Sequence, residues 1–483
     1  MRLHLINLLL TAFSLSSNLS AQIDPSLIDI YSGPSSSNPE DLFPLNEKLF
    51  FLADDGIHGE ELWWYDCVSN DTSFIDFNPG MADSRINYMD AKGDTLFFNA
   101  DNGTHGREFW WYDCTSGDTS FIDIYPGPNP SNPSNITAIK DRIFFAADDG
   151  IHGEELWWYD CVSGDTSFID IYPGPAGSGP SDFIQVGDKV FFVATHESLG
   201  NELWYYDCTN GDTAVIDIRP GFLSSSASDL IAIDDKIFFS GRNANSGIEL
   251  WIYNATTADT SFVDINAGNG DSYPSLFTVV GNKLVFRANN GLNGTELWIY
   301  DCSNNDTSMV DIYPGPTSGF VTGFVTKGDR IFFGAEDGVH GIELFWYDCV
   351  NESLSFADVV PGPQGGDVDR LVAAGDHIVF RANDGVNGRE MWWYNCTNGS
   401  LASYDINPGP NGSAMNEATA LGDKLFFEAD NGMNGGELYR LDIAELITGP
   451  VVPTLSEWGL ILLGIFCLIV GVASIRYRQV SIS

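Results

Sequence analysis

The amino-acid sequence predicts an all-β protein, a β-propeller of nine 47-residue, four-stranded repeats. Two series of acidic residues carry this prediction, because each returns every 47 residues without insertion or deletion. The glutamates are Glu61, Glu108, Glu155, Glu202, Glu249, Glu296, Glu343, Glu390 and Glu437. The aspartates are Asp29, Asp76, Asp123, Asp170, Asp217, Asp264, Asp311, Asp358 and Asp405. Units of this length are too small to bury a core alone, so successive units are expected to stack on one another.

Each unit contains four short β-type runs separated by turn residues. In the copy that spans residues 228–266, the runs are 230–233, 236–240, 249–253 and 261–265. The segments between them are polar or contain glycine and asparagine, which is typical of hairpin turns. We therefore expect each unit to form a small antiparallel sheet.

The third run of the unit is apolar on both faces. Leu62 and Trp63 follow Glu61, and every copy has Leu, Phe or Met at the first of these positions and an aromatic residue at the second. Successive side chains of a strand point to opposite faces, so such a sheet must be covered on both sides. Four-stranded sheets that cover one another around an axis form a propeller.

The two ends of the repeat region predict that the ring closes. Residues 26–31 have the sequence of a fourth strand with no first three strands before it, and residues 418–442 supply the first three strands with no fourth. The N-terminal strand is therefore expected to complete the last sheet. Because propellers usually have roughly four to eight blades, an eight-bladed ring with a spare unit and an open superhelix are alternatives.

The repeats span residues 22–446, and the segments before and after them predict where the protein is located. Residues 1–21 contain one arginine, an apolar stretch and small residues ending at Ala21, which is typical of a secretory signal peptide. Residues 447–458 form a linker, and residues 459–475 carry no charge and are long enough for one C-terminal transmembrane helix. The basic tail, residues 476–483, is expected in the cytoplasm, which places the repeats outside.

A short motif precedes the predicted transmembrane helix and follows Val452. It consists of Pro453, Thr454, Leu455, Ser456, Glu457, Trp458 and Gly459. The order of motif, apolar span and basic end resembles the IPTL-CTERM sorting tails of bacterial surface proteins, which usually have isoleucine in place of Val452. This resemblance implies that an exosortase-type transpeptidase recognises the tail and cuts near the motif, so that the protein is released or transferred to the cell surface. A simple membrane anchor is the alternative.

The repeat itself also resembles a known family. The residues Gly59, Glu60, Glu61, Leu62 and Trp63, followed by Asp66, are similar to the ELWxxDGT repeats of bacterial exported proteins, and the resemblance covers residues 26–442. This chain departs from that pattern after the aspartate, where it has Cys67. The resemblance implies a surface repeat architecture without a defined ligand.

The formal net charge of -45 limits the classes of partner. A field of this sign repels nucleic acid and anionic lipid and favours cations and cationic partners. We therefore expect no nucleic-acid binding. A solvated acidic exterior on an exported protein is the simpler interpretation of the same charge.

Acidic loops before the third run offer candidate metal ligands. Asp54, Asp55, Asp148 and Asp149 each lie just before a glycine and upstream of a glutamate. Carboxylate oxygens suit Ca²⁺, although the spacing is not that of an EF-hand. The alternative is a hairpin turn in which the aspartates accept hydrogen bonds from backbone amides. No other cofactor is expected.

Two further series are expected to be structural. Seven cysteines share one position after the third run, and equivalent positions on successive blades lie too far apart for a disulfide, so we expect partly buried free thiols. Four histidines share a loop position and are expected to make local hydrogen bonds: His58, His105, His152 and His340. The glutamates that occur in every copy are expected to satisfy backbone amides at the edge of each blade.

No copy carries catalytic groups that the others lack, and the sequence contains no GxSxG or HExxH motif. The sequence therefore indicates an exported, non-enzymatic binding or adhesion scaffold that presents repeated loops to a surface glycan or protein. One alternative is a hydrolase or lyase that acts on extracellular polysaccharide, with His196 and Glu197 in a divergent loop as the residues to test. Another alternative is a calcium-binding structural surface protein.

Overall fold

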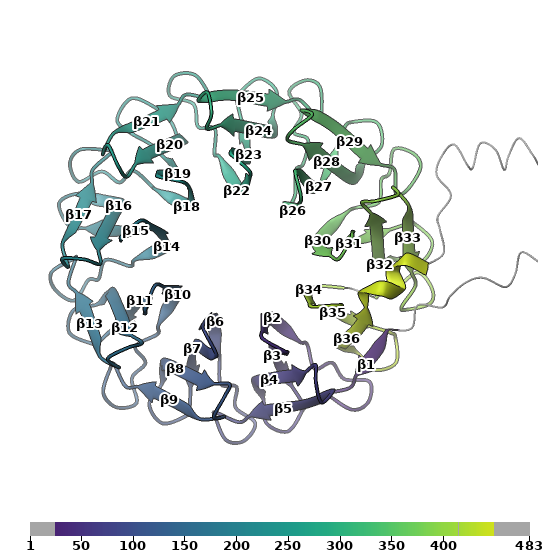
Figure 1. Cartoon of the computed structure of the whole chain (residues 1–483), viewed down its shortest axis with the longest axis horizontal. Coiled ribbons are helices and arrows are strands. Elements are labelled where there is room, and N and C mark those ends of the chain that lie inside the picture. The colour runs from purple at the N-terminus through teal and green to yellow at the C-terminus, as the bar shows by residue number, and fades with distance from the viewer. Residues whose placement is uncertain (1–24, 414, 449–483) are drawn as a thin grey trace, which may run out of the picture.

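The computed structural model describes residues 25–413 and 415–448. In this part of the chain, nine four-stranded antiparallel sheets, or blades, surround a central channel (Figure 1). The predicted signal peptide, sorting motif, transmembrane helix and basic tail lie outside the described residues. No helix of the described part is long and apolar enough to cross a membrane.

Eight blades are continuous along the chain, and the innermost strand of each comes first. Blade 1 comprises β2 (Glu40–Leu45), β3 (Lys48–Asp54), β4 (Glu60–Asp66) and β5 (Asp71–Ile75), and blade 2 comprises β6 (Asn87–Lys92), β7 (Thr95–Asp101), β8 (Arg107–Asp113) and β9 (Thr119–Ile122). Blade 3 comprises β10 (Ser134–Ile139), β11 (Arg142–Asp148), β12 (Glu154–Asp160) and β13 (Thr166–Ile169), and blade 4 comprises β14 (Ser181–Val186), β15 (Lys189–His196), β16 (Gly200–Asp207) and β17 (Thr213–Ile216). Blade 5 comprises β18 (Ser228–Ile233), β19 (Lys236–Gly241), β20 (Glu249–Asn254) and β21 (Thr260–Val263), and blade 6 comprises β22 (Ser275–Val280), β23 (Lys283–Asn289), β24 (Thr295–Asp301) and β25 (Asp306–Val310). Blade 7 comprises β26 (Val325–Lys327), β27 (Arg330–Glu336), β28 (Ile342–Asp348) and β29 (Ser353–Ala357), and blade 8 comprises β30 (Asp369–Ala374), β31 (His377–Asn383), β32 (Arg389–Asn395) and β33 (Leu401–Tyr404). The predicted runs agree with these strands to within one or two residues at most ends.

Blade 9 joins the two ends of the repeat region. It comprises β34 (Ala418–Leu421), β35 (Lys424–Asp430), β36 (Gly436–Asp442) and β1 (Ser26–Ile28). Strand β1 pairs antiparallel with β36, with Leu27 opposite Tyr439. Phe426 and Leu438 of blade 9 pack in one buried cluster with Leu49 and Phe51 of blade 1. The predicted closure is therefore confirmed, and the described chain forms one closed ring of nine blades rather than an eight-bladed ring or an open superhelix.

The core lies between neighbouring blades, as the two-sided apolar strands predict. One phenylalanine of the second strand is completely buried in every blade: Phe51, Phe98, Phe145, Phe192, Phe239, Phe286, Phe333, Phe380 and Phe427. Each buried cluster combines residues of two adjacent blades, as Phe144 of blade 3 packs with Phe192 and Trp204 of blade 4. Burying one such side chain stabilises the fold by about 1.5–3 kcal/mol, so each blade depends on both neighbours.

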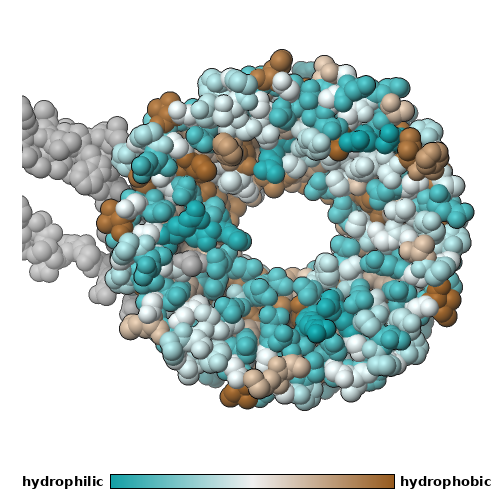
Figure 2. Space-filling model, turned by 180° about the vertical axis from the view of Figure 1, so that it is seen from behind, coloured by the Kyte–Doolittle hydropathy of each residue, from teal (hydrophilic) through white to brown (hydrophobic). Residues whose placement is uncertain are grey.

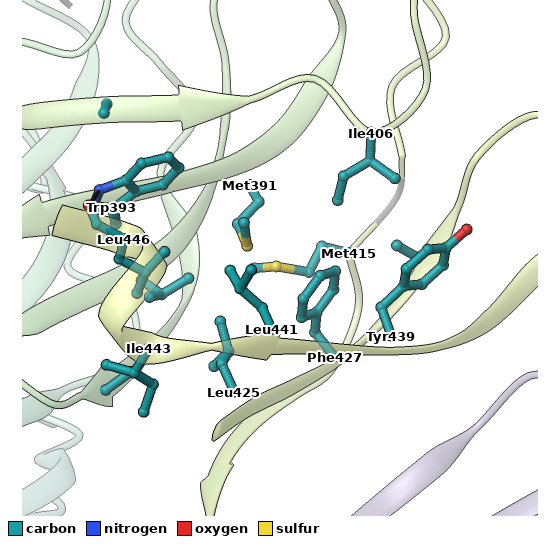
Figure 3. Packing of buried hydrophobic residues seen from close by; sticks show 14 residues of the cluster. Met391, Trp393, Ile406, Met415, Leu425, Phe427, Tyr439, Leu441, Ile443 and Leu446 are labelled. Atoms are coloured by element: carbon teal, nitrogen blue, oxygen red, sulfur yellow. Dashed lines mark hydrogen bonds between the residues drawn. The ribbon is translucent and has the colours of Figure 1, made fainter. Parts of the chain in front are cut away.

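The described chain ends in a short 3₁₀ helix, η1 (Ile443–Thr448), that packs against blades 8 and 9. The indole nitrogen of Trp393 donates a hydrogen bond of 2.7 Å to the carbonyl oxygen of Leu446. Figure 3 shows Leu446 beside Trp393, close to Met391 and Leu441 in the same cluster. Figure 1 shows η1 beside blades 8 and 9 and β1 as the outermost strand of blade 9, so both ends of the described chain lie away from the channel.

The innermost strands carry a feature that the sequence analysis did not predict. Most of them shift register near their start, as β2 does between Glu40 and Phe43. The residue in the shift takes a positive φ, close to 50–60°, in these strands: Asp41, Tyr88, Asn135, Asp182, Asp229, Leu276 and Arg370. Such β-bulges bend the strand and change the direction in which one side chain points. Here that side chain belongs to the wall of the channel.

Candidate functional site

The repeated glutamates clamp each blade to the connection that leads to the next blade. All nine are 0–2% exposed. In blade 5, Glu249 Oε2 accepts hydrogen bonds from the backbone nitrogen of Ile265 at 2.8 Å and from the hydroxyl of Ser272 at 2.7 Å. These partners lie 16 and 23 residues further along, in the connection to blade 6. The expected role of satisfying backbone amides is confirmed.

The same clamp closes the ring. Glu437 Oε2 accepts hydrogen bonds from the backbone nitrogen of Ile30 at 3.0 Å and from the hydroxyl of Ser37 at 2.6 Å. These partners are about 400 residues away in sequence, yet they occupy the positions that Ile265 and Ser272 occupy around Glu249. The interaction that stabilises each blade therefore also joins the two ends of the chain.

Burial raises the pKa of these repeated glutamates. Desolvation raises the pKa of Glu249 to about 7 and that of Glu343 to about 8, although the hydrogen bonds that they accept act in the opposite direction. Burial likewise raises the pKa of the equivalent groups: Glu61, Glu108, Glu155, Glu202, Glu296, Glu390 and Glu437. Nine equivalent groups with equivalent partners form a repeated structural device.

The loop aspartates accept hydrogen bonds from their own loops. Asp54 Oδ1 accepts from the backbone nitrogen of Gly56 at 2.7 Å, and Asp55 Oδ1 accepts from those of Ile57 and His58 at 2.8 and 2.9 Å. Asp148 and Asp149 make the same interactions in blade 3. The described residues contain no group of three or more His, Cys, Asp or Glu side chains arranged to hold a metal ion. The geometry is that of a capped turn, and calcium binding stays a prediction.

The loop histidines act locally, as expected. His58 Nδ1 lies 2.7 Å from Asp55 Oδ2, and this hydrogen bond raises the pKa of the imidazole. The ring also lies 4.8 Å, centroid to centroid, from that of Phe74 on the fourth strand. His152 and His340 repeat the aspartate contact. Each histidine thus fastens its loop to its own blade.

The cysteines are also as expected. All seven cysteines within the described residues are free. They lie at the turn after the third strand, where burial raises the pKa of the thiols, to about 11 for Cys114 and Cys349. Thiols with a raised pKa are poor nucleophiles at neutral pH. Cys467 lies outside the described residues.

The divergent loop of blade 4 places its two candidate catalytic residues apart from the channel strands. Glu197 is exposed in the loop after β15. His196 is half-buried, and its ring lies 6.1 Å from Trp204. Its Nδ1 lies 3.1 Å from the hydroxyl of Ser198. The structure brings His196 into its own hairpin rather than to a constellation of titratable groups.

The channel wall contains a hollow that the sequence analysis missed. We name it the closure hollow, because it spans the innermost strands of blades 9, 1 and 2; its volume is about 500 Å³. It is lined by Asp41, Leu42, Phe43, Asn87, Tyr88, Met89 and Glu417. Figure 2 shows the channel open from behind the view of Figure 1, with mostly hydrophilic side chains around it. The residues at these positions differ between the nine copies, and this variation is the sequence signal that could have pointed to the hollow. Only the closed ring shows that residues 41, 88 and 417 line one hollow.

Comparison with known proteins supports the predicted sorting tail. Residues 452–466 match the IPTL-CTERM motif, which confirms the predicted sorting motif. No curated protein matches the chain. The 15 or so residues of the motif are a small part of the chain and do not assign the ring to a family.

Solved structures resemble the ring only distantly. The computationally designed Ika8 protein is 14% identical, with 74% of this chain and 96% of that chain covered and a TM-score of 0.43. A chain from a structural and mechanistic study of two prolyl endopeptidases is 10% identical, with 76% of this chain and 55% of that chain covered and a TM-score of 0.42. The β-propeller domain of the Trilobed protease from Pyrococcus furiosus is 14% identical, with 69% and 98% covered and a TM-score of 0.36. Similarity at this level carries no argument about activity.

Proposed function

We propose that this chain is an exported cell-surface protein whose ring is a non-enzymatic binding or adhesion scaffold and whose tail is sorted by an exosortase-type transpeptidase. The observation that carries the proposal is the IPTL-CTERM match at residues 452–466. The match begins a few residues after η1, which ends at Thr448 and packs against blades 8 and 9. A tether that leaves from blades 8 and 9 keeps the channel and the other blades free for a surface glycan or protein.

The uniform blades support a scaffold rather than an enzyme. Catalysis requires a nucleophile, acid or base within hydrogen-bond reach of another group in one place. The buried glutamates instead repeat with the same backbone partners around the ring. As a check on the polysaccharide hydrolase or lyase alternative, the His196→Ala and Glu197→Gln variants can be compared with the native chain on a glycan panel, where we expect binding without turnover.

Processing of the tail tests the proposal directly. We suggest expressing the full chain in a bacterium that has an exosortase system, beside a variant in which Pro453 and Thr454 are replaced by alanine. The native chain should lose its C-terminal segment and reach the cell surface or medium, while the variant should stay at full length in the membrane fraction. Val452→Ile, which restores the commoner residue, is the matched control and should be processed. Equal retention of the native chain and the Pro453/Thr454 variant would support a simple anchor.

A further inference from the structure

We propose that the closure hollow binds an organic ammonium group, supplied by a polyamine or by the lysine side chain of a peptide. The inference rests on the proposed binding function of the ring and names the class of ligand. It is carried by a cavity of about 500 Å³ whose wall combines an aromatic ring, an amide and carboxylates on three adjacent strands.

The backbone displays the polar and aromatic groups of this hollow. Asp41 and Tyr88 occupy the bulge positions of β2 and β6, with φ of 54° and 56°. Tyr88 is 48% exposed on β6, the innermost strand of blade 2. The left-handed conformation is sparsely populated by residues other than glycine, asparagine and aspartate, and a tyrosine there is unusual. Asp41 and Tyr88 thus both line the hollow, from the innermost strands of adjacent blades.

Carboxylates gather at the junction of blades 9 and 1, and two arginines of blade 8, Arg370 and Arg381, act on Glu428 beside Glu417. Glu417 Oε2 accepts a hydrogen bond of 3.3 Å from the backbone nitrogen of Leu42, which fixes this carboxylate at the junction of blades 9 and 1. Burial raises the pKa of Glu417, and the charges of Asp41 and Glu40 add to the shift. Burial and the nearby Glu40 likewise raise the pKa of Glu60 to about 7. Like charges this close favour a cationic ligand, because it would relieve their repulsion.

The chemistry of the wall favours an organic cation over a metal ion. No described group of three or more acidic, histidine or cysteine side chains is arranged for a metal. An ammonium group on a methylene chain uses both parts of the wall, since it can pair with Asp41 and Glu417 while its methylenes and charge lie against Tyr88. The net charge of -45 attracts such ligands to the channel over a distance.

The other blades supply matched comparisons. The residues equivalent to Tyr88 are Asp41, Asn135, Asp182, Asp229, Leu276, Gly323, Arg370 and Glu417. Asn135 of blade 3 takes a φ of 53°, close to that of Tyr88 and Asp41. The variants Tyr88→Asn and Asp41→Asn therefore place a residue that this fold already accepts at that position. Asp229→Asn, at a φ of 59° in blade 5, makes the same change in charge outside the hollow.

Calorimetric titration of the purified full chain with spermidine, in detergent and at physiological ionic strength, tests the inference. Tyr88→Asn and Asp41→Asn should each weaken binding about tenfold, while Tyr88→Phe and Asp229→Asn should stay within about twofold of the native chain. A trilysine peptide in place of spermidine distinguishes a peptide source from a free polyamine, and binding of either supports the site.

Three results would overturn the inference. They are the absence of binding by both probes, an equal loss for Asp41→Asn and Asp229→Asn, and equal competition by Mg²⁺ at the same charge concentration. The last two would assign binding to the general acidic field. Folding of each variant is checked by its melting temperature. Surface processing of the tail is measured separately, so failure of the ammonium site leaves the proposed sorting and scaffold function intact.

Discussion

Glutamate is suited to the head of each third strand because of its reach. Glu249 contacts a backbone nitrogen 16 residues away and a serine hydroxyl 23 residues away with the same oxygen atom. An aspartate is one methylene shorter and would leave at least one of these donors without a partner inside the core. The periodic glutamates and their structural role could be predicted from sequence. The serines that donate to these glutamates were not predicted, because glycine replaces serine at this position in two copies, at Gly319 and Gly366.

Removing one clamp should destabilise the ring. Glu249→Ala leaves the buried nitrogen of Ile265 without its carboxylate acceptor and leaves the hydroxyl of Ser272 only the carbonyl oxygen of Ile248, and we expect the free energy of unfolding to fall by about 2–4 kcal/mol. Glu249→Gln keeps one oxygen acceptor and should lose less. Urea unfolding followed by tryptophan fluorescence measures both variants. An equal loss for alanine and glutamine would show that the hydrogen bonds do not provide the stability.

The same clamps should make stability depend on pH. The pKa of Glu249 is raised from 4.5 to about 7 in the folded state, so the folded chain holds the proton more tightly than the unfolded chain. The resulting stabilisation is fully present below the unfolded pKa and is lost as the pH rises through the folded pKa. We therefore expect the melting temperature to fall between about pH 5 and about pH 9.

Surface repulsion gives a trend of the same sign, so the pH experiment needs a control. Added salt screens exposed charges but has little effect on buried carboxyl groups. The fall in melting temperature should therefore persist in about 0.5 M salt. A melting temperature that becomes independent of pH at this salt concentration would assign the effect to the surface.

At the scale of the element, β1 decides whether the ring is closed. It supplies the fourth strand of blade 9, and Leu27 packs on the cluster that contains Leu441 and Ile443. This arrangement could be predicted because the strand sequence at residues 26–31 had no blade of its own. The bulges of the innermost strands could not, because the residues at their left-handed positions range from Asp41 to Tyr88 and Leu276 and share no type that marks such a conformation.

A matched pair of substitutions tests the contribution of β1. Leu27→Asp introduces a charge into the half-buried interface with β36 and should lower the free energy of unfolding by about 2–4 kcal/mol. Ser26→Asp makes the same change at the exposed neighbouring position and should stay within about 0.5 kcal/mol. Thermal melting gives the stability, and small-angle X-ray scattering shows whether the ring opens. Similar behaviour of both variants would mean that β1 is not needed for closure.

The acidic loops make a separate prediction about metal ions. Because Asp55 and Asp149 already accept hydrogen bonds from their own loops, we expect calcium to change the melting temperature no more than magnesium does. The measurement compares the purified chain in calcium, in magnesium and with a chelator. A rise specific to calcium would instead support the structural calcium-binding interpretation, and Asp149→Asn should then remove part of it.

At the scale of the whole molecule, nine equal steps make one closed ring. The constant interval predicted the number of units, and the orphan fourth strand predicted closure. The sequence could not show whether nine small rotations between blades add up to a full turn, because that depends on how clusters such as Phe144 with Phe192 pack. The closure hollow was beyond prediction for the same reason, since it needs residues 41, 88 and 417 to become neighbours.

The equivalence of the interfaces predicts that the ring tolerates the loss of one whole unit. Deleting residues 181–227 removes blade 4 and joins Pro180 to Ser228, so that blade 3 meets blade 5. The side chains that blade 3 then contacts are Leu230, Ile237, Phe239, Trp251 and Tyr253, in place of Phe183, Val190, Phe192, Trp204 and Tyr206. Each pair is similar in size and apolar character, and stability in stacked repeats depends on such nearest-neighbour interfaces.

We therefore expect this deletion to give a soluble, closed ring of eight blades, a number within the usual range for propellers. Class averages from electron microscopy would count the blades. Deleting about half a unit, residues 181–204, is the matched control: it breaks the phase of the strands and should prevent folding. An aggregated product from the whole-unit deletion would mean that closure depends on the rotation set by nine specific interfaces, and that each blade is adapted to its place in the ring rather than interchangeable.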